Sequence, residues 1–257
     1  MKKILVSTAL TTSMLLAATN ANAQTKNNFG GFALALNGGM VGIEASGSRS
    51  GSATGGANNQ SSTGSVSVGK LTAIASIDAS YHFPVNPTFA IGLGVDYIPA
   101  KADISTGSRT ATRQEGGVAL ETQTSTTDNL NAQVKDHYMV YIQPTFAINK
   151  DSAFFAKVGY QKAETSFPAS FQTTVTGGGR ATETVTNRSP DLEGWSYSVG
   201  LKTYLTSQAF VAVEALYSDY DTIRTTTTQS GAGNTATKTY SAALEAVQAR
   251  ISLGFKF

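Results

Sequence analysis

Apolar and polar side chains alternate with a period of two at the C-terminal end of the chain. In residues 247–257 the odd positions are apolar or aromatic, ending on Phe255 and Phe257, and the even positions are polar, charged or glycine. This alternation is typical of a β-strand with one apolar face and one polar face. Similar segments recur and predict about eight strands. They cover residues 29–45, 68–83, 88–98, 134–148, 153–167, 194–205, 209–223 and 243–257.

The connections between these segments alternate in length. Long connections cover residues 46–67, 105–133, 168–193 and 224–242, and short turns cover residues 84–87, 149–152 and 206–208. Each segment is long enough for the roughly 9–11 residues with which a tilted strand crosses a bilayer. The pattern predicts an all-β fold: an eight-stranded antiparallel up-and-down transmembrane β-barrel with four long extracellular loops, short periplasmic turns and both termini periplasmic. The alternative is a soluble periplasmic β-sandwich, which has no reason to sort its loops in this way.

The ionisable residues of the strands lie on the polar face, so we expect the apolar face to meet lipid and the charges to face the lumen. The inward residues predicted in this way are Glu44, Asp78, Asp96, Lys157, Lys202, Glu214, Arg250 and Lys256. Charges inside a narrow barrel must pair, because an unpaired buried charge costs several kcal/mol. Glu214 is expected between Lys202 and Arg250 in one ion-pair network. The network is interpreted as the polar filling of the barrel, with a gate or narrow pore as the alternative.

Two strands depart from the regular pattern. In the first, the apolar parity changes between Leu36 and Val41, across Asn37-Gly38-Gly39. A β-bulge would absorb one residue there, and glycine suits a bulge. In the fourth, Pro144 removes one hydrogen bond of the ladder.

Aromatic residues of the predicted strands fall at two levels, as expected for two membrane interfaces. The periplasmic level consists of Phe83, Phe89, Phe146, Phe154, Phe255 and Phe257. The outer level consists of Tyr97, Tyr138, Trp195, Tyr197 and Tyr217.

The N-terminus predicts secretion. Lys2 and Lys3 precede a mostly apolar stretch, and Ala21-Asn22-Ala23 is a small-x-small cleavage site. Residues 1–23 are therefore expected to be a signal peptide, and residues 24–257 a single barrel domain. Without the two leader lysines, 19 basic and 17 acidic residues become 17 of each (19 − 2 = 17), so charge gives no support for a nucleic-acid partner. The chain has no cysteine, so it cannot form disulfides.

Candidate chemistry is sparse. The two histidines are His82 and His137, and neither has the spacing of a metal-ligand pair or of a nucleophile motif. His137 follows Asp136 and is interpreted as a solvated pair at the rim. We predict no cofactor, no metal site and no enzyme activity, with a rim hydrolase as the least favoured hypothesis.

The long connections are rich in Thr, Ser, Gly, Asn and Ala and cannot bury a core of their own. Threonine-rich alternation at residues 121–127, 173–176 and 225–228 predicts hairpins that continue the strands beyond the membrane. Polar protruding hairpins are suited to adhesion or to shielding of the cell surface.

With its cleavage site, eight alternating strands and terminal Phe255-Lys256-Phe257, the chain resembles the OmpA/OmpX-type small outer-membrane barrels. The resemblance implies a Gram-negative outer-membrane protein with lipid as a partner. It also implies insertion by the barrel-assembly machinery, with Phe255 and Phe257 as the assembly signal. The favoured function is structural or surface-interacting: envelope integrity, adhesion or defence through an unidentified extracellular ligand. The alternative is a narrow channel for ions or small solutes.

Overall fold

A computed structural model describes residues 29–54, 60–99, 101–104, 107–115, 118–128, 132–167, 169–175, 180–186, 190–231 and 234–257. Its strands are β1 (Gly31–Thr54), β2 (Gln60–Asn86), β3 (Phe89–Ile98), β4 (Ala102–Ile104), β5 (Gly107–Glu115), β6 (Val118–Asp128), β7 (Ala132–Ala147), β8 (Ser152–Ser166), β9 (Ser170–Val175), β10 (Arg180–Val185), β11 (Asp191–Tyr204), β12 (Ala209–Gly231) and β13 (Asn234–Lys256). The predicted signal peptide, residues 1–23, lies outside the described residues. Within them, no helix is long and apolar enough to cross a membrane.

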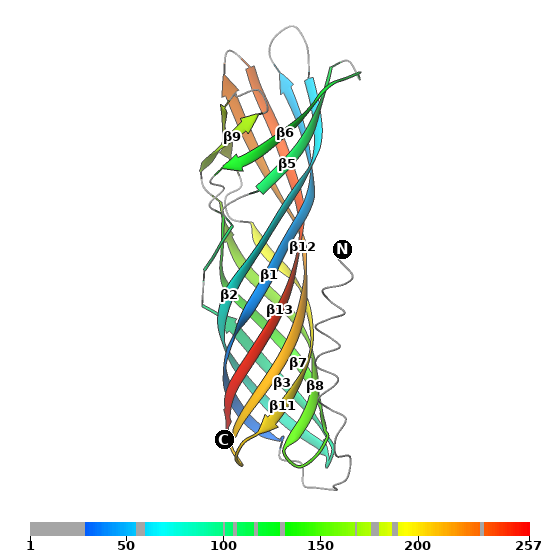
Figure 1. Cartoon of the computed structure of the whole chain (residues 1–257), viewed down its shortest axis with the longest axis vertical. Coiled ribbons are helices and arrows are strands. Elements are labelled where there is room, and N and C mark those ends of the chain that lie inside the picture. The colour runs from blue at the N-terminus through cyan, green and yellow to red at the C-terminus, as the bar shows by residue number, and fades with distance from the viewer. Residues whose placement is uncertain are drawn as a thin grey trace.

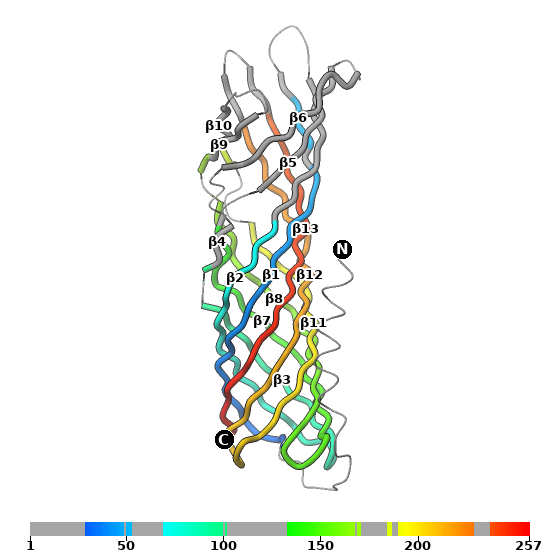
Figure 2. Tube along the Cα trace, viewed as in Figure 1, coloured from blue at the N-terminus to red at the C-terminus, as the bar shows by residue number. Residues whose placement is uncertain are grey.

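Eight of these strands form a closed antiparallel barrel. Each pairs with the next in the order β1, β2, β3, β7, β8, β11, β12, β13, and β13 pairs with β1. The strands wind around one axis, and the C-terminus lies at the end with the short turns (Figure 2). We call this end the turn end and the opposite end the loop end. Closure gives every strand of this ring a partner strand on both sides, as a backbone surrounded by lipid requires. The predicted eight-stranded barrel is confirmed.

A second closed ring continues the barrel at the loop end. β1, β2, β12 and β13 run on past the first ring, and β5, β6, β9 and β10 complete the circle between β2 and β12 (Figure 1). The weakest joint is β10–β12, which pairs only Thr184 with Thr228 and Val185 with Thr227. Residues 225–228 continue β12 as predicted, whereas residues 121–127 and 173–175 lie in the separate strands β6 and β9, which pair with each other, and residue 176 lies outside the described residues. We call this second ring the loop ring.

Side chains in the first ring follow the expected alternation. On β3 the outward residues are exposed and the inward residues are buried, from Ala90 to Ile98. Outward positions carry large apolar side chains such as Leu93, Ile251 and Leu253, which are exposed in the isolated chain. Because the inward positions carry the charges, these apolar side chains form the lipid-facing surface.

All eleven aromatic residues predicted at the interfaces lie on outward positions of the strands. At the turn end, Phe89 packs on Phe146 with ring centroids 4.8 Å apart, and Phe255 packs on Phe257 at 5.2 Å. At the other level, Tyr97 pairs with Tyr138, and Tyr197 with Tyr217. Tyr160 belongs to this level too, because its ring packs against Trp195. The two levels mark the edges of an apolar band.

Polarity inverts beyond the second aromatic level. Val41 and Leu244 are buried inside the barrel there. Glu44 and Glu245 are exposed on its outer face, opposite each other in the register of β1 and β13. A barrel wall that leaves the lipid has water outside, so its apolar side chains turn inward as in a soluble barrel. The prediction that Glu44 faces the lumen is wrong for this reason.

The same inversion removes the need for a bulge in β1. The registers of β1 with β13 and with β2 run without a shift from Ala33 to Ala53. The alternation of burial is equally continuous, and only the chemistry of the two faces changes. The predicted bulge at Asn37-Gly38-Gly39 is therefore wrong.

A bulge does occur on β7. Its register with β8 shifts between Lys135 and Tyr138, and Asp136 has a positive φ of 50°. An aspartate tolerates this conformation better than most residues. Pro144 lies within β7 without breaking its register with β3.

Candidate functional site

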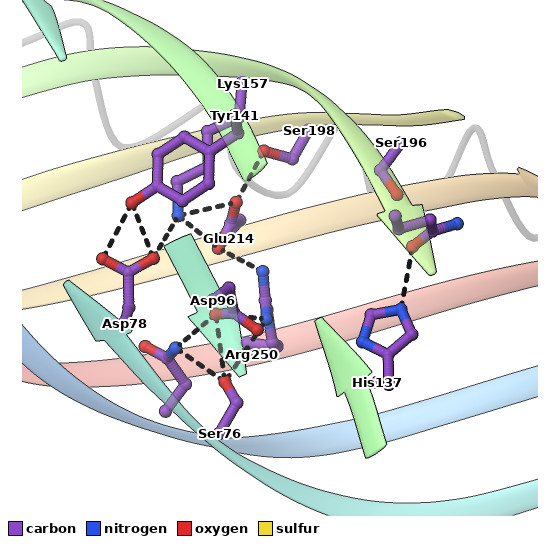
Figure 3. A network of polar contacts seen from close by, with 12 residues as sticks. Ser76, Asp78, Asp96, His137, Tyr141, Lys157, Ser196, Ser198, Glu214 and Arg250 are labelled. Carbon is purple, nitrogen blue, oxygen red and sulfur yellow. Dashed lines mark hydrogen bonds and ion pairs between the residues drawn. The ribbon is translucent and has the colours of Figure 1, made fainter. Parts of the chain in front are cut away.

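The lumen of the first ring contains a chain of alternating charges (Figure 3). The carboxylates and cations follow the order Asp78, Lys157, Glu214, Arg250, Asp96, and all five residues are buried. We call this group the lumen network. They come from β2, β8, β12, β13 and β3, so the charges meet only because the sheet closes.

Distances within the lumen network are those of direct ion pairs. Lys157 Nζ lies 3.4 Å from Asp78 Oδ2 and 3.4 Å from Glu214 Oε1. The two guanidinium nitrogens of Arg250 lie 3.0 Å from Glu214 Oε2 and 3.1 Å from Asp96 Oδ2. Glu214 therefore joins two cations, and each cation also meets a second carboxylate. This geometry compensates for the loss of hydration that makes buried charges costly.

Neutral side chains complete the network from the other three strands. Tyr141 of β7 donates its hydroxyl to Asp78 at 2.7 Å, Ser198 of β11 donates to Glu214, and Asn37 of β1 donates to Asp96 at 3.0 Å. Each strand of the first ring thus contributes a group. Tyr141 was not among the predicted lumen residues, which were ionisable side chains on the polar faces of the strands. Its parity, opposite to that of Val140 and Ile142, is the signal that could have placed it.

Lys202 and Lys256 face the lumen but lie closer to the turn end. Lys202 is buried, and its ammonium lies 4.6 Å from the ring centre of Phe210. Lys256 is half-buried, with its ammonium 5.5 Å from the ring centre of Tyr204. The second cation at Glu214 is therefore Lys157, not the predicted Lys202. Lys202 lies opposite Ala212 in the register of β11 and β12, and Phe210 lies two positions from Ala212 on the same face of β12. The inward ring of Phe210 therefore holds the Lys202 ammonium in a cation–π contact.

An aromatic cluster closes the lumen at the turn end. Phe29 precedes β1 and is buried against Tyr204, with ring centroids 5.4 Å apart, and Tyr204 packs on Phe210 at 5.5 Å. We call these three side chains the aromatic plug. Phe29 was predicted as the start of a strand, but it lies in a turn and fills the lumen instead.

Both histidines are buried in the lumen. His82 Nε2 lies 3.2 Å from Ser80 Oγ, and His137 Nε2 lies 3.0 Å from Gln161 Oε1. His137 is thus not part of a solvated pair with Asp136, because the bulge turns Asp136 outward and His137 inward. Within the described part of the chain, no group of three or more His, Asp and Glu side chains is arranged to hold a metal ion.

Charged side chains cover the outer face just beyond the second aromatic level. Lys162 lies 2.8 Å from both Asp191 and Glu193, and Lys135 lies 2.9 Å from Glu164. The hydrogen bonds that Lys162 and Tyr160 donate lower the pKa of the Glu193 carboxyl. These solvated pairs contribute little stability, and they mark where the wall leaves the apolar band.

Comparison with known proteins gives a family match and several structural likenesses. A family model described as "Outer membrane protein beta-barrel domain" matches residues 10–235. No curated protein matches the chain. The fold is similar to that of Ail, the attachment invasion locus protein of Yersinia pestis, at 13% sequence identity, covering 81% of this chain and 98% of that one, with a TM-score of 0.34.

Two further solved structures are similar to a comparable extent. The outer membrane protein OprG from Pseudomonas aeruginosa is 12% identical, with 92% of this chain and 100% of that chain covered and a TM-score of 0.41. The outer membrane protease OmpT from Escherichia coli is 10% identical, with 87% and 97% covered and a TM-score of 0.39.

Proposed function

The chain belongs to the outer membrane protein beta-barrel domain family, and from this premise we propose that it is a non-conducting barrel with a surface-interaction role. In this proposal the turn end faces the periplasm and the loop end faces the exterior of a Gram-negative cell. The first ring anchors the protein in lipid, and the loop ring meets the extracellular ligand. Insertion by the barrel-assembly machinery, with Phe255 and Phe257 as its signal, belongs to the same proposal.

The observation that carries the proposal is the loop ring. Four hairpin strands, β5, β6, β9 and β10, pair with one another and with extensions of the membrane strands. Backbone pairing of this kind holds polar segments in defined positions, which independent loops would not achieve. Ordering before contact lowers the entropy that a binding partner must otherwise offset. A pre-ordered polar surface suits adhesion better than passive filling of the membrane.

Trimming the loop ring should abolish attachment while leaving the barrel in the membrane. Replacing residues 105–131 by a short Gly-Ser linker removes β5 and β6 but leaves the pairing of β3 with β7 intact. We expect cells carrying this variant to lose most of the attachment to protein-coated and glycan-coated surfaces that the full chain confers. Attachment and surface accessibility are measured at equal outer-membrane levels of heat-modifiable protein.

A matched control changes the opposite end of the molecule. Replacing residues 149–152 by a Gly-Ser turn of equal length should leave attachment unchanged.

Peptide tags at positions 55–59 should be accessible on intact cells, and tags at residues 149–152 should not. Undiminished attachment by the trimmed variant, or the reverse accessibility, would contradict the proposal.

The lumen supports the non-conducting part of the proposal over a narrow channel. The lumen network crosses the interior, and the aromatic plug fills it at the turn end. An eight-stranded barrel has an interior only wide enough for its own side chains.

In planar bilayers we therefore expect no stable conductance steps from the purified protein. The Phe29→Ala/Phe210→Ala double variant should stay closed too, because the lumen network still blocks the path. Regular, reproducible single-channel steps from the unmodified protein would favour the channel.

A further inference from the structure

A small cavity lies inside the barrel between the lumen network and the loop ring. Its volume is about 60 Å³, and its wall is mainly apolar. Buried Val41, Leu192, Leu244 and Ala246 belong to the apolar cluster that surrounds it. Pockets with apolar walls and a few polar groups are the usual form of a small-molecule site.

Two polar side chains in this wall have buried acceptor atoms without a partner. They are His137 Nδ1 and Gln248 Oε1. Gln161 Oε1 accepts a hydrogen bond from Ser218 and lies 3.0 Å from His137 Nε2; with this orientation of the Gln161 amide, whose own Nε2 has no partner, His137 Nε2 carries the ring proton. In the neutral ring Nδ1 is then an acceptor. The residues that line the cavity thus include two with an unpartnered acceptor, besides the exposed Lys101, and a ligand that brings a donor matches these acceptors.

Beside the cavity, one edge of β2 has no strand partner among the described residues. β2 pairs with β3 from Ile77 onward and with β5 up to Ser67, and no described pairing joins residues 68–76 of β2 to a strand on that edge. Ala73, at an outward position of β2, and Ile74, at an inward one, both line the cavity. Ile98 and Lys101 line it from the end of β3 and the residues after it. A cavity lined by both residues, beside a strand edge without a described partner, has its access to the outer surface at this edge.

The outer surface next to this opening is apolar. Leu71 is 69% exposed and Met40 is 44% exposed, and both point outward on β2 and β1. Met40 pairs with Ala73, so the lipid-facing surface is continuous with the mouth of the cavity. On β7, β8 and β11 the wall already carries charged pairs at the corresponding boundary. A molecule dissolved in the bilayer therefore has an apolar route to the mouth.

We propose that this cavity binds the hydroxyl end of a linear alkanol that enters from the membrane. The hydroxyl donates to His137 Nδ1 or Gln248 Oε1, and the alkyl chain lies along the apolar wall toward Ala73. The volume fits a narrow chain end: a water needs roughly 10–15 Å³, and a cavity of about 150 Å³ encloses benzene. Toward these two acceptors a carboxylate brings only acceptors, and its cationic partner in the lining, Lys101, is exposed.

The test compares 1-octanol, octane and octanoate in lipid nanodiscs that contain the full chain. Binding is followed by NMR through methyl labels on four residues of the lining: Ile74, Ile98, Val41 and Leu244. All three ligands partition into the bilayer, so the ligand concentration is expressed as moles of ligand per mole of lipid. We expect saturable shifts of these methyl groups, with octanol binding about three- to tenfold more tightly than octane, the ratio given by one net hydrogen bond. Octanoate binding more tightly than octanol would contradict the proposal, because Lys101 in the lining and not the acceptors would then select the ligand.

Three variants separate the site from its surroundings. Ala246→Leu should fill the cavity and abolish the shifts, and Gln248→Leu should reduce the preference for octanol over octane. Gln143→Leu is the matched control, because Gln143 is buried in the lumen, bonds to Thr145 and does not line the cavity. It should leave the octanol-to-octane ratio unchanged. Heat-modifiable migration checks that each variant is folded.

Each of the following results would contradict the proposal. Equal affinity for octanol and octane in the unmodified protein would show that the unpartnered acceptors play no part. Methyl shifts that persist in Ala246→Leu, or that are absent from the unmodified protein, would show that the cavity is not the binding site. If Ala246→Leu does not fold, the comparison of Gln248→Leu with Gln143→Leu decides.

Discussion

Glu214→Gln should destabilise the barrel by roughly 3–5 kcal/mol, the cost expected when one partner of a buried ion pair is removed. Glu214 lies between Lys157 and Arg250, and all three side chains are almost completely buried. The glutamine leaves the two cations facing one another without the carboxylate between them. Unfolding in urea from lipid vesicles, followed by the fluorescence of Trp195, measures the change.

Glu193→Gln is the matched control. Its carboxylate also pairs with a lysine, at 2.8 Å, but its side chain is 37% exposed. Losing a solvated pair costs about 0–1 kcal/mol. A cost of the same size for Glu193→Gln and Glu214→Gln would contradict the distinction between a buried network and a surface pair.

A second substitution should restore part of the stability lost in Glu214→Gln. Lys202 contributes a positive charge to the same lumen but contacts aromatic rings. In the Glu214→Gln/Lys202→Met double variant, the pairs Lys157–Asp78 and Arg250–Asp96 remain, and the formal charges of the lumen network and position 202 together sum to zero, as they do in the unmodified protein. If the network is instead a gate, Glu214→Gln would open a conductance with little loss of stability.

Ile251→Arg should destabilise the barrel by about 2–4 kcal/mol, the cost of an arginine facing lipid near the centre of a bilayer. Ile251 is 60% exposed on the outer face of β13, midway between the aromatic end of the strand and Glu245. Its side chain has no route to water without bending toward an interface. The same unfolding measurement in vesicles gives the change in free energy.

Glu245→Arg is the control on the same strand and the same face. Six residues separate the two positions, so their side chains point in the same direction, but Glu245 lies beyond the inversion of polarity. An arginine there meets water and should change the stability by less than about 1 kcal/mol. Equal costs at the two positions would mean that the boundary of the apolar band has been placed wrongly.

The period-two pattern of the sequence predicted the membrane strands and their order because lipid and lumen impose opposite chemistry on alternate residues. The interpretation failed where it assumed that the apolar face of a strand points outward along the whole length of the strand. At Val41 and Glu44 it gave an apparent bulge and a false lumen residue, since water replaces lipid outside the wall at that height. The sequence carries the alternation, but not the position of the membrane boundary along each strand.

What the sequence determined by itself was local: strand period, turn positions, the residues that face lipid and most of the charges that face the lumen. The tertiary structure decided which of these residues meet. Glu214 pairs with Lys157 of β8 because barrel closure and strand stagger set the heights of side chains that lie far apart in the chain. The same closure turned Phe29 into a plug, brought His137 beside Gln161 and joined separate hairpins into the loop ring. Alternation fixes only the direction of each side chain, whereas contact depends on register and stagger, which arise when all the strands pair.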